Sequence, residues 1–309
     1  MTNGNGTEVT EFFLLEFGAE HRFQHVLFTV FLLIYVTCMV DNIGMILLIK
    51  ADSRLQTPMY FFLQHLTFVD ICFTTTVSPK TLQNLISENK SISFMGCVMQ
   101  LWVYGTFGTN DCYLLAAMAV NCYVAICKPL HYPIVMSHTI LIQFIAGSYV
   151  ISSINTSVHT GLLFSLSFCN SHIINHFFCD GSPILAIPCS NTAISIMLLV
   201  VFVGFNLAFT MLAVIFSYIY ILATILKMPS TAGRRKTFTT CVSHLTAVTI
   251  FYGTLSYMYL QPHSNNSQNN MKVGSIFYGI LIPMLNPLIY SLRNKEVKEG
   301  LKGIGKKIF

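Results

Sequence analysis

Three carboxylates lie inside long apolar stretches of this chain, where a charged group is costly. They are Asp41, Asp70 and Asp111, and no Lys or Arg lies at a similar depth. The polar side chains available as partners within the apolar stretches are Asn42 and Asn286. A carboxylate in a low-dielectric site takes up a proton or binds a cation. Two interpretations of Asp70 and Asp111 therefore stay open: a shared small cation, or two protonated acids hydrogen-bonded within the protein.

The cysteines fall into two groups. Four of the ten lie at or between the ends of long apolar stretches on the same side: Cys97, Cys169, Cys179 and Cys189. Four cysteines in an oxidising compartment predict two disulfides, with three possible pairings. The other six lie in or near apolar stretches, where a cysteine packs as a small apolar residue: Cys38, Cys72, Cys112, Cys122, Cys127 and Cys241.

Two further groups could carry chemistry. His172, His176 and Cys179 are close enough in sequence to suggest a zinc site, but a disulfide would consume the thiolate that zinc needs. Ser243 and His244 are adjacent, yet neighbouring residues on a helix point about 100° apart and do not form a nucleophile–base pair. We therefore expect a protein that is not an enzyme.

Seven apolar stretches must position these residues, and each is long enough to cross a bilayer. They cover residues 25–49, 58–86, 93–127, 139–166, 193–226, 237–261 and 272–292. Hydrophobic residues make up 54% of the chain and charged residues only 9%. Nearly all Lys and Arg fall on one side of this topology, which predicts an extracellular N-terminus and a cytoplasmic C-terminus. The predicted fold is an all-α membrane protein with a seven-helix bundle.

The chain then divides into an extracellular tail at 1–24, a seven-transmembrane domain at 25–292 and a cytoplasmic tail at 293–309. Asn5 opens a glycosylation sequon in the first tail. The last tail has Lys between apolar residues at helical spacing, which predicts a short amphipathic helix on the membrane surface. The net charge of +5 is spread over short loops and this tail, which favours contact with lipid headgroups over nucleic acid.

Five motifs in order along the chain carry a family resemblance. They are Pro58–Leu63, then Tyr123–Tyr132 after Met118-Ala119, then Ser217-Tyr218, Lys236–Leu245 and Pro283–Asn294. Together they resemble the olfactory (odorant) receptors, within the rhodopsin-like class A of G-protein-coupled receptors. The resemblance covers nearly the whole chain, and the five motifs fall on the expected helix ends.

The resemblance implies a multi-pass plasma-membrane receptor that binds a small volatile odorant and activates a heterotrimeric G protein of the stimulatory, olfactory type, which leads to cAMP. It implies disulfides Cys97–Cys179 and Cys169–Cys189. It places a sodium ion, the one cofactor expected, at Asp70, Asp111 and Asn286. The residues it assigns to coupling and switching are Asn121, Cys122, Tyr123, Tyr218, Lys236, His244, Asn286, Pro287 and Tyr290.

Two positions depart from the family pattern. The family has Asp-Arg-Tyr where this chain has Asn121-Cys122-Tyr123, and Cys122 has neither the charge nor the length of the arginine. The family has Gly where this chain has Asp41, which adds an acid to the first span. The alternative prediction is therefore a receptor of the same fold that couples weakly or is decaying.

Helical spacing predicts which side chains line a ligand pocket near the extracellular end. The candidates are mostly aromatic, aliphatic or small: Tyr104, Gly105, Gly108, Thr109, Cys112, Phe202, Val203, Asn206, Tyr252, Leu255, Ser256, Tyr259, Ile276 and Gly279. That composition is typical of a site for small apolar ligands, although the same stripes also occur as packing. The nearest acid on the third span, Asp111, is 14 residues beyond Cys97, about 21 Å along a helix. A neutral ligand is therefore favoured over a cationic amine.

A transporter or channel is the remote alternative. Transporters often contain two related halves with broken helices at mid-membrane, and this chain shows no such repeat. Pro283 and Pro287 interrupt the seventh span, but a receptor needs that kink as well.

Overall fold

The computed structural model describes residues 9–15, 21–168, 172–189, 192–259, 267–293 and 297–300. Six long helices are continuous: α1 His21–Ala51, α2 Pro58–Ile86, α3 Phe94–Cys127, α5 His138–Phe164, α7 Ala193–Lys227 and α8 Thr231–Tyr259. A seventh span consists of α9 Ser267–Ile276, a π-helical turn Phe277–Leu281 and α10 Ile282–Arg293. Shorter pieces are the 3₁₀ turn Ser53–Leu55, α4 Tyr132–Val135 and α6 Gly181–Leu185.

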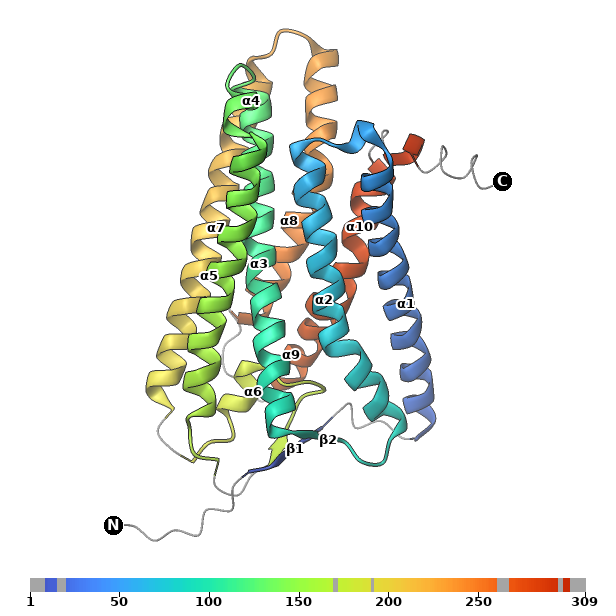
Figure 1. The fold of residues 1–309 in the computed structure, drawn as a ribbon, viewed down its shortest axis with the longest axis vertical. Coiled ribbons are helices and arrows are strands. Elements are labelled where there is room, and N and C mark those ends of the chain that lie inside the picture. The colour runs from blue at the N-terminus through green and yellow to red at the C-terminus, as the bar shows by residue number, and fades with distance from the viewer. Residues whose placement is uncertain are drawn as a thin grey trace.

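The seven spans stand side by side as one elongated bundle (Figure 1), which confirms the predicted all-α, seven-helix fold. Most helix bounds agree with the predicted apolar stretches, but the last two spans begin earlier than predicted, and α9 begins at Ser267 and not at residue 272. α8 begins at Thr231, whereas the apolar stretch was predicted to begin at residue 237. Its first turns are polar and basic, so hydropathy alone does not reveal that the helix extends past the apolar part.

Five of the spans are long and apolar enough to cross a membrane by composition alone: Phe23–Ala51, Phe94–Cys127, His138–Phe164, Ala193–Lys227 and Asn270–Ser291. α2 and α8 are more polar. In α2 the polar side chains of Thr67, Asp70, Thr74 and Ser78 are fully buried inside the bundle. A span that hides polar groups among its neighbours can cross a membrane at lower hydropathy, because those groups do not meet lipid.

A three-stranded sheet closes one end of the bundle, which we call the sheet end (Figure 1). Strand β1, Glu11–Leu14, pairs antiparallel with β2, Ser91–Ser93, and parallel with β3, Ile173–Ile174. Alternate residues of β1 are buried, and Phe12 and Leu14 enter an apolar cluster beneath the sheet. The sheet is an addition to the predicted fold, because strands of two to four residues are too short to show a pattern of their own.

Lys272 links the seventh span to the segments of this sheet by hydrogen bonds. Its Nζ donates to the carbonyl oxygen of Leu15 at 3.1 Å and to Oδ1 of Asn175 at 2.8 Å. One cation thus joins the N-terminal segment, the loop that carries β3 and α9.

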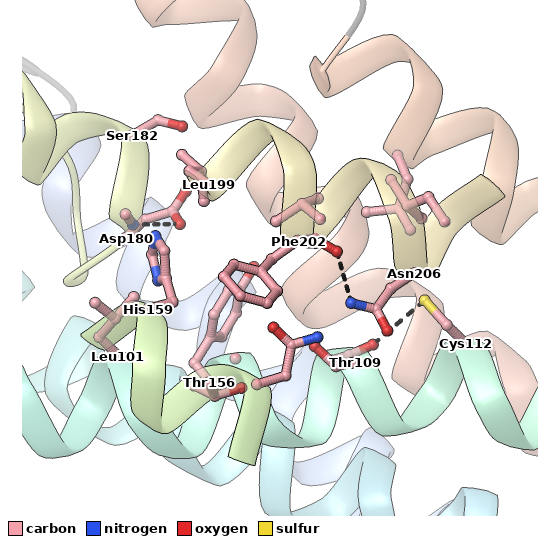
Figure 2. Close-up of a pocket in the computed structure, with 18 of the residues that line it drawn as sticks. Leu101, Thr109, Cys112, Thr156, His159, Asp180, Ser182, Leu199, Phe202 and Asn206 are labelled. Carbon is pink, nitrogen blue, oxygen red and sulfur yellow. Dashed lines mark hydrogen bonds between the residues drawn. The ribbon is translucent and has the colours of Figure 1, made fainter. Parts of the chain in front are cut away.

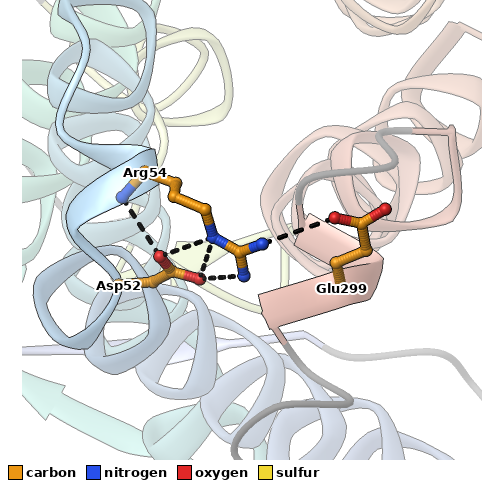
Figure 3. Close-up of polar contacts among 3 residues, drawn as sticks. All are labelled: Asp52, Arg54 and Glu299. Atoms are coloured by element: carbon orange, nitrogen blue, oxygen red, sulfur yellow. Dashed lines mark hydrogen bonds and ion pairs between the residues drawn. The ribbon is translucent and has the colours of Figure 1, made fainter.

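The opposite end, which we call the tail end, carries the α1–α2 connection, α4 and the end of α10 (Figure 1). Arg54 makes ion pairs with Asp52 at 2.7 Å and with Glu299 at 3.4 Å (Figure 3). Residues 297–300 are helical, Val297 is fully buried, and a Cβ on Gly300 would lie 3.0 Å from Leu48 Cδ1. This turn packs on α1, and residues 301–309, which hold the rest of the predicted surface helix, lie outside the described part.

Candidate ligand-binding and switch sites

A cavity of about 110 Å³ lies between α3, α5, α6, α7, α8 and the π-helical turn (Figure 2). Apolar side chains make up much of its wall, with hydroxyl, amide, imidazole and carboxylate groups between them. Its volume is close to that of an engineered protein cavity, about 150 Å³, that binds benzene. It is therefore suited to a compact molecule.

Nine of the fourteen residues predicted to line a ligand pocket line this cavity: Tyr104, Gly105, Gly108, Thr109, Cys112, Phe202, Val203, Asn206 and Leu255. All of the α3 and α7 candidates are among them. These helices are regular in this region, so the spacing of three to four residues places the side chains correctly.

The remaining five candidates do not line it in the described structure. Tyr252 is buried and donates from its hydroxyl to the carbonyl of Cys112 at 3.5 Å, below the cavity. Ser256 also falls outside the lining, and the side chain of Tyr259 lies outside the described residues.

The seventh span places Tyr278 in the cavity wall instead of the predicted Ile276 and Gly279. A π-helical turn at Phe277–Leu281 adds a residue to the turn and rotates the rest of the helix about its axis. The prediction for this span assumed a regular α-helix throughout, and the π-helical turn departs from that assumption.

Helical spacing on four spans missed part of the wall. The fifth helix contributes Asn155, Thr156 and His159, and the loop after the disulfide contributes Asp180, Gly181 and Ser182. Leu101, Leu199, Leu207 and Tyr278 complete the set. The prediction left out α5 altogether, and no periodicity indicates that a loop folds down into the bundle.

The predicted disulfide Cys97–Cys179 is present, with a Cα–Cα distance of 5.5 Å between residues 82 apart in sequence. Gln100 adds a second link, because its Oε1 accepts from the backbone N–H of Cys179 at 2.9 Å. Both contacts fix the loop to α3 just before Asp180. Cys189 is also disulfide-bonded, and its predicted partner Cys169 lies outside the described residues.

The zinc alternative fails at the same disulfide. Cys179 has no thiolate to offer, and no group of three metal-ligating side chains occurs in the described part of the chain. His176 is packed between Phe177 and Phe178, with ring centroids 4.6 Å away in each case. Burial lowers the pKa of His176 to about 3, with the nearby charge of Lys272 adding to the effect, so the imidazole is neutral.

Asp70, Asp111 and Asn286 are all buried inside the bundle. Asn286 donates from Nδ2 to both carboxylate oxygens of Asp70, at 3.2 and 3.0 Å. Asp111 is buried, and its Oδ1 has no hydrogen-bond partner among the described residues. Oxygen ligands with an unsatisfied carboxylate suit a hard cation, so these three residues fit the ion that the resemblance implies.

Asp41 differs from the other two acids. It is only partly buried, and the described residues offer it no hydrogen bond. It is therefore not joined to the polar cluster of Asp70, Asp111 and Asn286 by any hydrogen bond in the described structure.

Cys122 is buried at the tail end of α3, in a small apolar cluster with Ile221, Ile225 and Cys241. Next to it, Asn121 accepts a hydrogen bond from the Tyr132 hydroxyl at 3.1 Å. Tyr123 packs on Tyr220 with ring centroids 5.8 Å apart. The described part of this junction between α3, α7 and α8 thus holds an uncharged thiol where the family pattern has an arginine.

His244 joins three helices. The carbonyl of Leu115 can only accept, so Nε2 of His244 donates to it, at 3.1 Å. Nδ1 is then the acceptor for the Tyr218 hydroxyl, at 2.6 Å. Both ring nitrogens are in use, which leaves no base for Ser243 and agrees with the expectation that this pair does no catalysis.

The structure describes some, but not all, of the other residues assigned to switching. Pro287 lies inside α10, and Tyr290 is buried with its hydroxyl unpartnered among the described residues. The side chain of Lys236 and the whole of Asn5 lie outside the described part of the chain.

The bundle, the disulfide from α3 to the long loop and the cavity beneath it define a rhodopsin-like receptor. Squid rhodopsin has the same fold, with a TM-score of 0.71 over 93% of this chain and 82% of that chain, at 16% identity.

The chain belongs to the olfactory receptor family, whose profile matches residues 31–306. It is 72% identical to olfactory receptor 5AK3 of Homo sapiens, over 96% of this chain and 100% of that protein. It is 70% identical to olfactory receptor 5AK2 of Homo sapiens, over the full length of both.

Proposed function

We propose that this receptor binds small, mostly neutral and apolar volatile molecules in the cavity between α3, α5, α7 and α8. The observation that carries the proposal is the position of the cavity. It lies directly beneath the Cys97–Cys179 disulfide, and Phe202, Leu199 and Leu255 give it an apolar wall. Ligand sites in proteins are concave and mostly apolar, with a few polar groups that orient the ligand.

Binding is coupled to a stimulatory, olfactory-type G protein and to cAMP, with the N-terminus extracellular and the tail end cytoplasmic. This orientation is based on the distribution of Lys and Arg. It places the α3, α7 and α8 junction, with Cys122 and His244, on the side where a G protein is found. Membrane lipids are the remaining partners, around the apolar outer faces of the helices.

A sodium ion held by Asp70, Asp111 and Asn286 is part of the same proposal. When bound, it would neutralise two carboxylates that the bundle desolvates. Asn286 holds Asp70 in place by two hydrogen bonds, and Asp111 offers an oxygen that the described residues leave unpaired.

A second candidate function is a receptor that binds ligand but couples weakly. Cys122 favours it, because the apolar cluster around this thiol offers the G protein no fixed positive charge. The two candidates differ in the ratio of signalling to binding, and not in the ligand site.

The test is a broad odorant panel in cells with a cAMP reporter and a surface stain, with Val203→Phe as the blocked control. Val203 lines the cavity from α7, so a ring at this position fills space that a ligand needs. We expect responses in the wild type that are lost in Val203→Phe at equal surface density. Equal responses in both would place the ligand elsewhere.

A further inference from the structure

We propose that the cavity selects compact molecules that carry a hydrogen-bond donor, a hydroxyl or an amine, and that Asp180 is the acceptor for that donor. This inference rests on the proposed ligand-binding role of the cavity and names the chemistry of the ligand's head group. It adds amines to the mostly neutral ligands proposed above, because Asp180 gives the cavity a carboxylate that the third helix does not supply there.

Asp180 is held in a fixed position at the sheet end of the cavity. It comes directly after Cys179, which is tied to α3 by the disulfide, and it caps the N-terminus of α6. Its Oδ1 accepts from the backbone N–H of Gly181 at 2.7 Å. The described residues give Oδ2 no hydrogen-bond partner, so one oxygen orients the carboxylate and the other remains to accept from a ligand.

His159 of α5 packs closely against the loop that carries Asp180. A Cβ on Gly181 would lie 3.1 Å from His159 Cε1, so the imidazole rests directly on the glycine (Figure 2). The groups around Asp180 are therefore His159 from α5 and Ser182 from α6, and both line the cavity.

The electrostatics of the wall favour a donor. Asp180 is the only carboxylate among the lining residues, and none of them is Lys or Arg. Burial raises the pKa of Asp180 to about 6, so the anion still predominates at neutral pH. A desolvated carboxylate gains from a hydroxyl or ammonium donor, since hydrogen bonds to ionised groups are roughly twice as strong as neutral ones. A carboxylate ligand would be repelled, and an aldehyde has no donor to offer.

The rest of the cavity accepts an apolar body. Figure 2 shows Leu199 and Phe202 between Asp180 at one end and Thr109, Asn206 and Cys112 at the other. Asn206 is not free to anchor a head group, because it accepts from the Tyr113 hydroxyl and donates to the carbonyl of Phe202 at 2.6 Å. The Asp180 end is thus the one that holds an available acceptor with a charge.

The experiment compares four compounds with one carbon skeleton: pentanol, pentylamine, pentanal and pentanoic acid. Purified receptor in lipid nanodiscs is titrated with each, and binding is monitored by the shift in unfolding temperature. We expect pentanol and pentylamine to bind at least about tenfold more tightly than pentanal, and pentanoic acid to bind most weakly, as expected for a charge-assisted hydrogen bond.

Asp180→Asn is the decisive variant. Asn is as good an N-cap as Asp, so α6 keeps its cap while the charge is lost. We expect the preference for pentanol and pentylamine over pentanal to fall to less than about threefold, because the acceptor is now neutral. Glu299→Gln is the matched control, since it makes the same carboxylate-to-amide change at the tail end, away from the cavity, and should leave the preference unchanged.

Two results would overturn the proposal. Pentanal could bind wild type as tightly as pentanol, or the preference could survive in Asp180→Asn. If binding shows no head-group preference but is lost in Val203→Phe, the cavity remains the ligand site and only the donor inference fails. If none of the four compounds stabilises the wild type, both the inference and the proposed ligand site are wrong.

Discussion

At the scale of single residues, two side chains separate this receptor from the pattern of its family. Cys122 replaces an arginine with a short thiol, and that thiol is buried in an apolar cluster with Cys241, Ile221 and Ile225. Asp41 adds a carboxyl group to α1. The first change lies at the tail-end junction that is proposed to couple to a G protein, and the second lies on α1, so their consequences can be measured separately.

Restoring the family motif should strengthen signalling. We expect the double variant Asn121→Asp, Cys122→Arg to raise agonist-driven cAMP about tenfold or more at equal surface density. The reason is that a charge-assisted hydrogen bond at a buried contact contributes about 1.5–3 kcal/mol. The measurement is a cAMP reporter normalised to a surface stain, with Cys122→Ala as the control. A wild-type response equal to that of the double variant would show that Cys122 is no handicap.

Acidity should distinguish amine from alcohol ligands. Asp180 loses its charge as the pH falls through its pKa of about 6. A protonated amine needs the anion, so its affinity should drop about tenfold between pH 7.4 and pH 5, by simple proton competition. The affinity of pentanol should change less, because a neutral carboxyl group still accepts from a hydroxyl.

The control for this pH dependence is Asp180→Asn, in which the affinity for pentylamine should no longer depend on Asp180. His159 faces the same corner, and its protonation would also disfavour an amine. A pH dependence that persists unchanged in Asp180→Asn would therefore assign the effect to His159 and contradict the prediction.

At the scale of elements, α3 connects the sites. Its sheet end carries the disulfide. Its middle lines the cavity from Leu101 to Cys112 and also carries Asp111, and Cys122 lies near its tail end. It packs against α2, α5, α7 and α8. A shift of α3 would therefore reach the cavity, the buried acids and the coupling junction together.

The buried acids predict a dependence on sodium. If Asp70 and Asp111 share the ion, wild-type receptor should unfold at a higher temperature in sodium chloride than in a salt of a bulky organic cation at equal ionic strength. Asp111→Asn should remove that difference, because it takes away one of the two charged ligands. Equal stability of the wild type in the two salts would mean that the acids are simply protonated and hydrogen-bonded.

The contact between α3 and α5 depends on a glycine. A Cβ on Gly105 would lie 2.8 Å from Thr156 Cγ2, which is closer than carbon atoms pack. Gly105→Ala should lower the unfolding temperature, with a cost of about 1–3 kcal/mol as for other overpacked cores. Thr156→Ser removes the methyl group, so the double variant should recover much of the loss. If the second change adds a further loss instead, the steric explanation is wrong.

At the scale of the whole molecule, the two ends of the bundle are built differently. The sheet end is closed by backbone pairing, a disulfide and the contacts of Lys272. The described part of the tail end is joined by partly exposed ion pairs of Arg54, which typically contribute no more than about 1 kcal/mol. The sheet end is thus cross-linked covalently, whereas the ion pairs of Arg54 at the end proposed to meet a G protein can rearrange at little cost.

The orientation of the whole molecule can be tested at Asn5. With the N-terminus extracellular, Asn5 is glycosylated, and Asn5→Gln should reduce the apparent mass by one glycan. An epitope tag at the N-terminus should stain intact cells, and a tag at the C-terminus should stain only permeabilised cells. The opposite staining pattern would reverse the proposed topology.

The sequence determined those features that depend on one helix at a time. Apolar length predicted the spans, and regular spacing on α3 and α7 predicted the cavity residues from Tyr104 to Cys112 and from Phe202 to Asn206. The family motifs predicted the Cys97–Cys179 pairing. These features survive because a straight helix converts spacing in sequence directly into position in space.

The tertiary structure decided what depends on contacts between distant segments. The π-helical turn put Tyr278 in the cavity wall in place of Ile276 and Gly279. The disulfide fixes the loop to α3, Gly181 packs on His159, and Asp180 enters the cavity wall as a carboxylate that spacing along α3 does not reveal. A break in helical register and the path of a loop are set by packing and cross-links between segments, and neither leaves a periodic signal in the chain.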